Sequence, residues 1–297
     1  MKFAVCCQIK DERRYIQEWC EYYLKIGFDD VFLYEDYGSV SHKDLVEKYE
    51  HVHLYTIQEV GIKNYHNSRT QHNLYHKLLY DFKKNMEYDW VAFFEVDEFL
   101  VFDKGYDLET LCDEFKDYAG VWLAWKMYNA CGHIKRPKGK VIDSYPYAFD
   151  EKSWMCLDST NGNQFIWNKK SIVNLHKAQT WYNIHEIKGG CDVEFSQNIF
   201  KAKVFKKAWI NHYFTKSWED YCERMQSRGN MRNDLRTFDQ FFLQNPELMY
   251  KKKELIEKER KNHLSGNMYI SRDMHIISGG NIDLWFEVQE NHKRKYS

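Results

Sequence analysis

The first hundred residues alternate between segments with the composition of strands and segments with helical periodicity. Strands are predicted at Phe3–Ile9, in "DDVFLYEDYGS" and in "HVHLYTI", which are short, apolar and rich in β-branched or aromatic residues. Helices are predicted at Glu12–Ile26, from Ser41 to about Tyr49, and at Arg69–Met86. Three such alternations predict a mostly parallel sheet with helices on both faces. Ligands bind to such sheets outside the carboxyl ends of the strands.

The stretch "DWVAFFEVDEFLVF", from Asp89 to Phe102, is predicted to be the fourth strand of this sheet. Ten of its fourteen residues are apolar, yet its second half carries Glu95, Asp97 and Glu98. Burying an unpaired carboxylate is costly, so these acids either lie where the strand leaves the core or meet a positive charge. In a strand, Glu95 and Asp97 share one face and Glu98 lies on the other.

Two carboxylates this close repel each other unless a cation lies between them. Ligation by oxygen alone favours Mg²⁺ or Mn²⁺, which keep positions open for water and for phosphate oxygens. Glu95 and Asp97 therefore predict a divalent metal presented to a phosphorylated ligand. The alternative is a solvated strand end, since acid-x-acid triplets also arise by chance. Acids turned away from a cleft, or paired with neighbouring lysines or arginines, would contradict the metal prediction.

The pattern is looser after Phe102. A short helix is predicted at Leu108–Phe115, a strand in "GVWLAWKMYN", and loops with short antiparallel strands from Cys131 to about Lys170. A late strand is predicted in "KAWINHYFTKS", followed by helical sequence from Trp218 to about His263. We expect one α/β domain over residues 1–235 and a helical C-terminal extension over residues 236–297.

Composition excludes several classes of protein. The 43 basic and 44 acidic residues give a net charge of −1, so nucleic acid is not an expected partner. The eight cysteines form no C-x-x-C pair, which argues against a zinc site and a disulfide framework and favours reduced thiols. No apolar window is as long as a membrane span. We expect a soluble protein of the cytoplasm or of the inner face of a membrane, with at most peripheral membrane contact.

Four segments in order carry a resemblance: "CCQIKDERRYIQEWCEYYLKIGFDDVFLYED", "RTQHNLYHKLL", "DWVAFFEVDEFLVF" and "NHYFTKSWEDYCERMQSRG". Together they resemble bacterial glycosyltransferases related to family 92 and the family 2 glycosyltransferase-like group, which share the GT-A fold. The resemblance covers roughly residues 1–235. Two positions depart from it: Glu95 replaces the usual Asp, and Lys10–Glu12 reads K-D-E instead of K-N-E.

The resemblance implies a metal-dependent, inverting transfer from a UDP-sugar to a surface glycan or a lipid-linked sugar, with galactose or a relative as the donor sugar. A Mn²⁺ or Mg²⁺ ion would bridge the two phosphates and stabilise the leaving diphosphate. Asp97 is then the firmest metal ligand, and Glu95 is its partner or a ribose contact. A late histidine completes the site, with His212 favoured and His185 as its rival.

The remaining roles that the resemblance implies concern the donor and the acceptor. Lys216 and Ser217 would meet phosphate oxygens, and Asp36 would accept hydrogen bonds from uracil or ribose. Arg69 and Gln71 would line the nucleotide pocket. An inverting transfer needs a general base, for which Glu186 is the candidate and Asp192 the runner-up. Ordinary structural roles are open for each: a surface lysine, an Asx turn at Asp36, or a salt-bridged acid.

Two other functions stay open from the sequence. A sugar nucleotidyltransferase also uses paired acids and Mg²⁺, but it would show a glycine-rich phosphate-binding turn, and "QIKDERR" has none. A non-catalytic carbohydrate-binding protein would use its aromatic residues, which make up 17% of the chain.

Overall fold

A computed structural model describes residues 1–63, 69–148, 169–181, 183–193, 206–227 and 238–263. Most of the predicted elements of the N-terminal half are present, with ends that differ by a few residues. The strands are β1 (Phe3–Ile9), β2 (Asp30–Glu35) and β3 (Val52–Thr56), and the helices are α1 (Ile16–Lys25), α2 (Lys43–Val46) and α3 (Arg69–Asn85). Gly27 follows α1 with a φ of 108°, the left-handed conformation that a glycine adopts after a helix.

The prediction of a single fourth strand over Asp89–Phe102 is wrong. The stretch forms two strands, β4 (Trp90–Phe93) and β5 (Glu98–Phe102), which are separated by a turn at residues 94–97. The next strands and short helices of the chain are α4 (Leu108–Glu114), β6 (Gly120–Met127), α5 (Val141–Ser144), β7 (Lys169–Asn174), β8 (Cys191–Asp192) and β9 (Ala208–His212). Residues 149–168, in the region predicted as loops and short strands, lie outside the described residues.

The described strands form one mixed sheet in the order β3-β2-β1-β4-β7-β6-β9-β5, with β8 paired to β6. The pairs β1–β2, β2–β3, β1–β4, β6–β8 and β6–β9 are parallel, whereas β4–β7, β6–β7 and β5–β9 are antiparallel. The mostly parallel α/β fold with a GT-A-like sheet is therefore confirmed.

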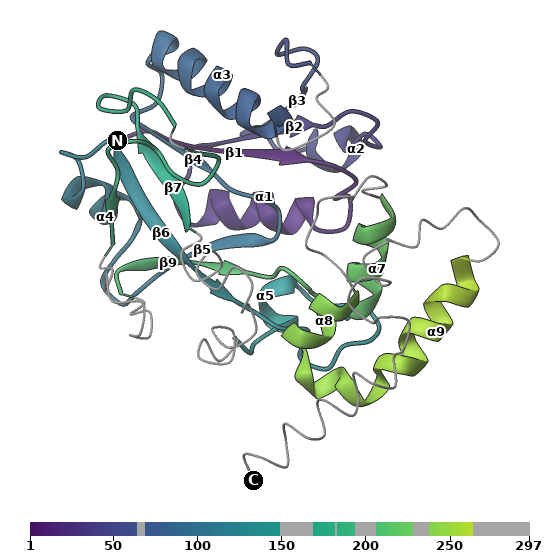
Figure 1. The fold of residues 1–297 in the computed structure, drawn as a ribbon. Helices are drawn as coiled ribbons and strands as arrows, with labels where there is room; N and C mark the ends of the chain where they lie inside the picture. Colours follow the sequence, from purple (N-terminus) through teal and green to yellow (C-terminus); the bar gives the residue numbers. More distant parts are fainter. Residues whose placement is uncertain (64–68, 149–168, 182, 194–205, 228–237, 264–297) are drawn as a thin grey trace.

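Both faces of the sheet are buried, as the apolar composition of β1 predicts. Val5 and Cys7 pack with Trp19 of α1 on one face, whereas Ala4 and Cys6 pack with residues of α3 on the other. Figure 1 shows α3 above the sheet and α1 below it. The seven described cysteines are free thiols, as predicted.

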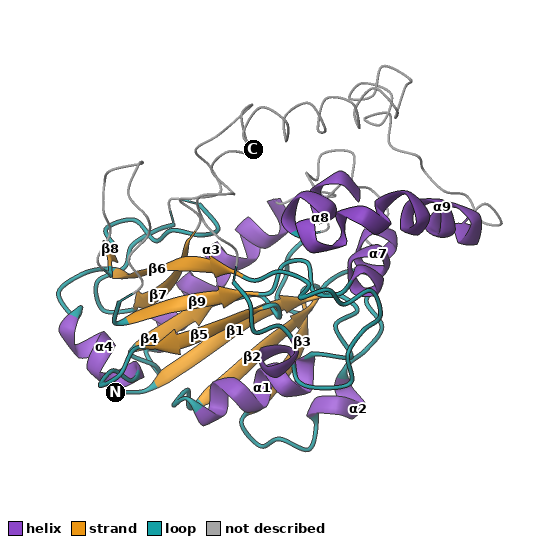
Figure 2. Ribbon diagram, turned by 90° about the horizontal axis from the view of Figure 1, so that it is seen from below, coloured by secondary structure: helices purple, strands orange, loops and turns teal. Residues whose placement is uncertain are grey.

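Helices gather at one end of the sheet (Figure 2). They are α7 (Trp218–Ser227), α8 (Phe238–Gln244), the 3₁₀ helix η1 (Pro246–Lys251) and α9 (Lys252–His263). A third apolar cluster joins α7 to α8, η1 and α9 through Trp218, Phe241, Phe242, Leu248 and Leu255. None of the described helices is long and apolar enough to span a membrane.

Candidate functional site

The acidic turn, residues 94–97 between β4 and β5, lies beyond the carboxyl end of β4. Its backbone closes through a hydrogen bond from Glu98 N to Glu95 O at 3.0 Å. The buried indole of Trp19 donates to Glu95 O at 2.9 Å and to Glu98 O at 3.1 Å. A side chain of α1 thus replaces the ladder partners that this backbone lacks, which fixes the turn without a glycine or a proline.

Glu95 and Glu98 meet one fully buried ammonium, that of Lys170 in β7. The Nζ atom of Lys170 lies 2.9 Å from Glu95 Oε1 and 3.6 Å from Glu98 Oε2, and Glu98 Oε2 accepts from Glu95 N at 2.8 Å. Burial raises the pKa of Glu95, but the charge and the hydrogen bond of Lys170, together with the charge of His212, lower it further than burial raises it, so Glu95 is ionised. Burial raises the pKa of Glu98 well above its usual range, which favours the neutral acid.

Asp97 meets two groups from late in the chain. Arg224 of α7 donates to Asp97 Oδ2 at 2.6 Å, and His212 Nε2 at the end of β9 lies 3.6 Å from the same oxygen. The β5–β9 ladder pairs Glu98 with His212, and Tyr213 N donates to Asp97 O at 2.8 Å. Although burial opposes ionisation, Arg224 and then His212 hold the pKa of Asp97 well below its usual range.

The structure therefore corrects how the acids were expected to meet positive charge. Glu95 and Asp97 do not share a strand face across one cation, since they belong to a turn and each has its own ion pair. Glu98 was expected to point away from Glu95, yet both contact Lys170. The positive charges beside the acids are lysine and arginine side chains of the chain itself. As stated above, such pairing contradicts the prediction of one cation held between the two acids.

Two histidines stand beside this cluster on either side of Trp125. The ring centroids of His212 and His185 lie 4.3 Å and 5.3 Å from that of Trp125. Burial lowers the pKa of both histidines, to about 3 for His185, so both are neutral at pH 7. Both ring nitrogens of His212 and Nδ1 of His185 are buried without a hydrogen-bond partner among the described residues. Buried polar atoms in that state are rare and indicate a missing ligand or water.

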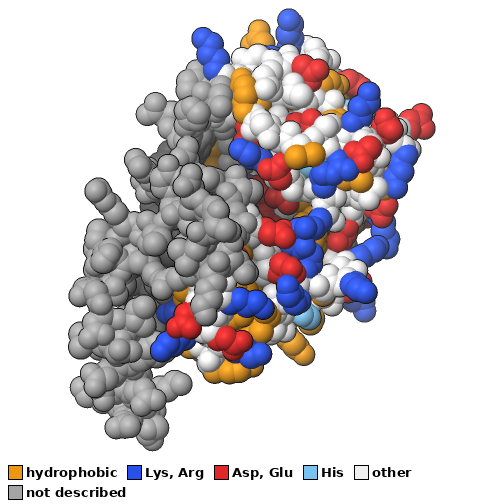
Figure 3. Space-filling model, turned by 90° about the vertical axis from the view of Figure 1, so that its right-hand side faces the viewer, with side chains coloured by type: hydrophobic (Ala, Val, Ile, Leu, Met, Phe, Trp, Pro, Cys, Tyr) orange, Lys and Arg blue, Asp and Glu red, His pale blue; other side chains and the backbone are white. Residues whose placement is uncertain are grey.

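A pocket of about 140 Å³ opens next to Asp97. The side chains that line it come from the loop after β1, the start of α1, the β9–α7 connection and α7: Lys10, Asp11, Glu12, Arg14, Tyr15, Phe214, Thr215, Lys216, Asp220, Glu223 and Arg224. Figure 3, which views the molecule from the right-hand side of Figure 1, shows Lys and Arg side chains interspersed with Asp and Glu. The face that it shows is thus of mixed charge, without one large patch of either sign.

Lys216 forms no close ion pair or hydrogen bond with a described residue, although its charge acts on Asp97 and Asp220. The residue is 5% exposed, and its Nζ lies 4.5 Å from the centre of the Tyr15 ring. Its backbone has a φ of 49°, which is uncommon for a residue with a side chain. Lys216 is therefore suited to an anion that enters the pocket.

The other predicted donor contacts have local roles. Ser217 caps α7: its hydroxyl donates to Asp220 Oδ2 at 2.6 Å and accepts from Asp220 N at 3.1 Å. Asp36 follows β2, and its side chain accepts from Tyr37 N at 2.8 Å in the turn expected as its alternative. Gln71 donates to Tyr75 Oη at 3.0 Å. Arg69 begins α3, but its side chain lies outside the described part of the chain.

The two base candidates lie together, but on the other face of the sheet. Glu186 and Asp192 both pair with Lys169 Nζ, at 3.0 Å and 3.3 Å. Lys169 and Lys170 are neighbours in β7 and so point to opposite faces. Because Lys170 points to Glu95, the sheet separates Glu186 and Asp192 from the acidic turn.

Asp97 and His212 are the donors here that best suit a divalent metal. Asp97 Oδ2 lies 3.6 Å from an unpartnered imidazole nitrogen, although Arg224 already donates to that oxygen at 2.6 Å. Glu95 fits less well, since Lys170 already holds its Oε1. Among the described residues, no three His, Cys, Asp or Glu side chains are grouped closely enough to hold an ion. A metal here would need further ligands from substrate or water.

Comparisons with known proteins bear on the chemistry of this site. Residues 1–262 match the model of glycosyltransferase family 92. None of the curated proteins compared with the sequence matches it.

Solved structures are similar at low TM-scores. The mannosyltransferase Ktr4p from S. cerevisiae is 14% identical with a TM-score of 0.26, and the match covers 46% of this chain and 42% of Ktr4p. Glucosyl-3-phosphoglycerate synthase from Mycobacterium tuberculosis, in complex with Mn²⁺, UDP and phosphoglyceric acid, is 10% identical with a TM-score of 0.26, with 44% of each chain covered. HddC from Yersinia pseudotuberculosis is 12% identical with a TM-score of 0.32, with 76% of this chain and 99% of HddC covered. The chain thus spans less than half the length of the first two, and the family match alone carries the assignment.

Proposed function

The chain belongs to glycosyltransferase family 92 and is therefore a glycosyltransferase, and we propose that it transfers a sugar from a UDP-sugar to a glycan or a lipid-linked sugar acceptor, with inversion. The observation that carries the donor proposal is the pocket lined by Lys216 and Arg224, where Lys216 forms no close ion pair with a described residue. A diphosphate in this pocket would give Lys216 a close anionic partner. Arg224, which also lines the pocket, presents a second cation to it.

In this proposal the residues of the pocket bind and orient the leaving diphosphate. Lys216 acts as a point charge on a phosphate oxygen, and the planar guanidinium of Arg224 can hold Asp97 and a phosphate at once. As the glycosidic bond breaks, negative charge grows on the diphosphate, so these cations stabilise the transition state more than the ground state. Trp19 and Lys170 contribute by holding the acidic turn in place.

A Mn²⁺ or Mg²⁺ ion is part of the proposal, with Asp97 and His212 as the residues that would hold it. When bound, such an ion supplies Lewis-acid stabilisation of the leaving diphosphate. Lys170 balances Glu95 and Arg224 balances Asp97, while Glu98 is neutral, so the side chains leave no net negative charge to attract a lone dication. We therefore expect metal and nucleotide to bind cooperatively, each raising the affinity of the other by the same factor.

Calorimetric titration of the chain with UDP, with and without Mn²⁺, tests this proposal. We expect UDP to bind at least tenfold more tightly with Mn²⁺. Lys216→Met should weaken UDP binding in both conditions, because it removes a phosphate contact. Asp97→Asn should remove most of the effect of Mn²⁺. Lys169→Met, a control that removes the partly exposed lysine next to Lys170 in β7, should bind UDP like the wild type.

Product analysis completes the test. Incubation with UDP-sugars and a glycan acceptor should release UDP, and NMR of the product should show the inverted anomeric configuration. An absence of UDP binding by the folded chain would refute the proposed donor. Equal UDP affinity with and without Mn²⁺, together with a large effect of Lys216→Met, would show that side-chain cations alone hold the diphosphate.

Seven free thiols and the soluble nucleotide donor lead us to place the reaction in the cytoplasm, with at most peripheral contact to a membrane that carries the acceptor.

A further inference from the structure

Two histidines on α3 face each other away from the acidic turn. His72 and His76 are four residues apart in the helix, so they lie on the same side, one turn apart. Their Nε2 atoms lie 2.9 Å apart, and their rings are nearly perpendicular, with centroids 4.4 Å apart and an interplanar angle of 80°. Both side chains are partly buried. Both histidines lie in the segment "RTQHNLYHKLL", and neither has a role in the proposed function.

The separation of the two nitrogens matches that of two ligands of one metal ion. Imidazole nitrogens bind Zn²⁺ at about 2.0–2.1 Å, so two of them at a right angle around one ion lie about 2.9 Å apart. A small increase in the distance between the two Nε2 atoms gives the wider ligand–metal–ligand angle of a tetrahedral ion. In the structure the two Nε2 atoms share a hydrogen bond, and a metal ion would take the place of the shared proton.

We propose that His72 and His76 form a binding site for a late first-row divalent ion, Cu²⁺, Ni²⁺ or Zn²⁺. Imidazole pairs prefer these ions, whereas Mg²⁺ and Mn²⁺ prefer carboxylate and phosphate oxygens. The site is thus chemically distinct from the one proposed at Asp97.

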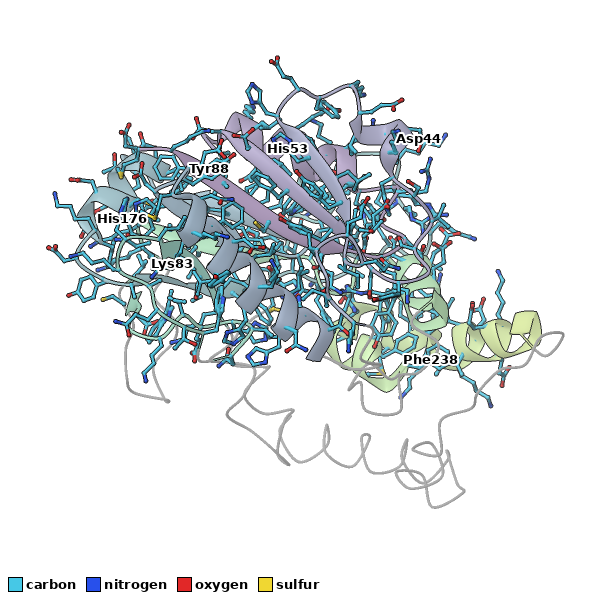
Figure 4. All side chains as sticks on the ribbon, turned by 90° about the horizontal axis from the view of Figure 1, so that it is seen from above. Asp44, His53, Lys83, Tyr88, His176 and Phe238 are labelled. Carbon is cyan, nitrogen blue, oxygen red and sulfur yellow. The ribbon has the colours of Figure 1, made fainter. Side chains whose placement is uncertain are left out.

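No third His, Cys, Asp or Glu joins the pair within the described part of the chain. The remaining positions of the ion are therefore open to water or to an exogenous ligand. The far end of α3 is anchored differently: Lys83 donates to the carbonyl of Ala178, and Figure 4 shows Lys83 and His176 at that end of the molecule. An ion on His72 and His76 would tie together two successive turns in the first half of the same helix.

Metal titration of the full chain tests this site. The chelator-treated protein is titrated with Cu²⁺ at pH 7.5 and followed by electron paramagnetic resonance, and Ni²⁺ and Zn²⁺ are titrated by calorimetry. We expect one strong Cu²⁺ site whose spectrum shows two nitrogen ligands. His72→Gln and His76→Gln should each weaken that site at least tenfold. Gln keeps the polarity and approximate size of the side chain, and circular dichroism checks that α3 remains folded.

Two controls separate this site from others. His51→Gln changes an exposed histidine at the other end of the fold and should leave Cu²⁺ binding unchanged. Asp97→Asn should also leave it unchanged, because the two sites share no ligand. Cu²⁺ affinity that survives both α3 substitutions in folded protein, or that falls with Asp97→Asn instead, would overturn the proposal.

Discussion

Lys170→Met should destabilise the fold through a single electrostatic change. The residue is fully buried, and its ammonium is the ion-pair partner of Glu95 at 2.9 Å. Removing one partner of a buried pair costs about 3–5 kcal/mol, because the other charge is left without compensation. The Glu95 side chain keeps 24% exposure and part of its hydration. We therefore expect the lower end of this range, a loss of about 3 kcal/mol in the free energy of unfolding at pH 7.

Urea unfolding followed by tryptophan fluorescence measures this change. Lys169→Met is the matched control, since Lys169 is the neighbouring strand residue and its side chain is 16% exposed, whereas that of Lys170 is fully buried. It should cost about 1 kcal/mol or less. Adding Glu95→Gln to Lys170→Met removes the uncompensated charge and should restore at least half of the lost stability. A loss below about 1 kcal/mol for Lys170→Met, or strictly additive effects in the double variant, would refute the reasoning.

The pH dependence gives a second reading of the same ion pair. In the wild type, the pKa of Glu95 is lower in the folded protein than in the unfolded protein. The contribution of ionised Glu95 to the free energy of unfolding is therefore complete above its unfolded pKa, and it is lost as the pH falls through its folded pKa. Without Lys170, burial and the charge of Asp97 raise the pKa of Glu95, and we expect it to lie above the unfolded value. The deficit of Lys170→Met should therefore shrink as the pH falls from 7 to 5.

Three further substitutions test other parts of the fold. Asp30 accepts from His53 and Tyr88, whose side chains Figure 4 places together at the strand ends, and its pKa is lowered; Asp30→Asn should therefore flatten the loss of thermal stability of the wild type between about pH 5 and pH 3, as measured by calorimetry. Gly120→Ala would place a Cβ 2.5 Å from the carbonyl oxygen of Ile172, and we expect a loss of about 3 kcal/mol in urea unfolding, whereas Gly139→Ala meets only the Ser144 hydroxyl and should be nearly neutral. Trp19→Phe removes the hydrogen-bond donor to Glu95 O and Glu98 O. We expect kcat to fall and the free energy of unfolding to decrease by about 1–3 kcal/mol. An unchanged kcat would show that the turn keeps its shape without the indole.

The N-terminal half of the fold is predictable because its signals are local. The apolar run Phe3–Ile9 is β1 to the residue, and the periodicity of residues 12–26 and 69–86 identifies α1 and α3. The break between β4 and β5 has no such signal, because the turn contains neither glycine nor proline. It is imposed by a distant group, the indole of Trp19, which no local pattern reveals.

The site was predictable in part for the same reason. Carboxylates at the end of an apolar strand are visible in the sequence, and His212 follows from the resemblance. Lys170 and Arg224 were not predicted as part of the site. Two adjacent lysines are typical of a polar segment, and an arginine in a helix is typical of a solvent-exposed helix face. Only the register of β7 and the placement of α7 show that these two cations are buried against Glu95 and Asp97.

The position of β5 in the strand order sets when the catalytic end of the molecule can form. β4 completes a local parallel unit with β1, but β5, the next strand in sequence, pairs only with β9, whose residues 208–212 come about a hundred positions later. Contacts of such long separation form late in folding, because loop closure must precede them. A nascent chain that has not yet reached His212 can therefore bury β1 to β4 while its acidic turn is still unpaired. Activity should appear only after the last strand docks, well after most of the secondary structure has formed.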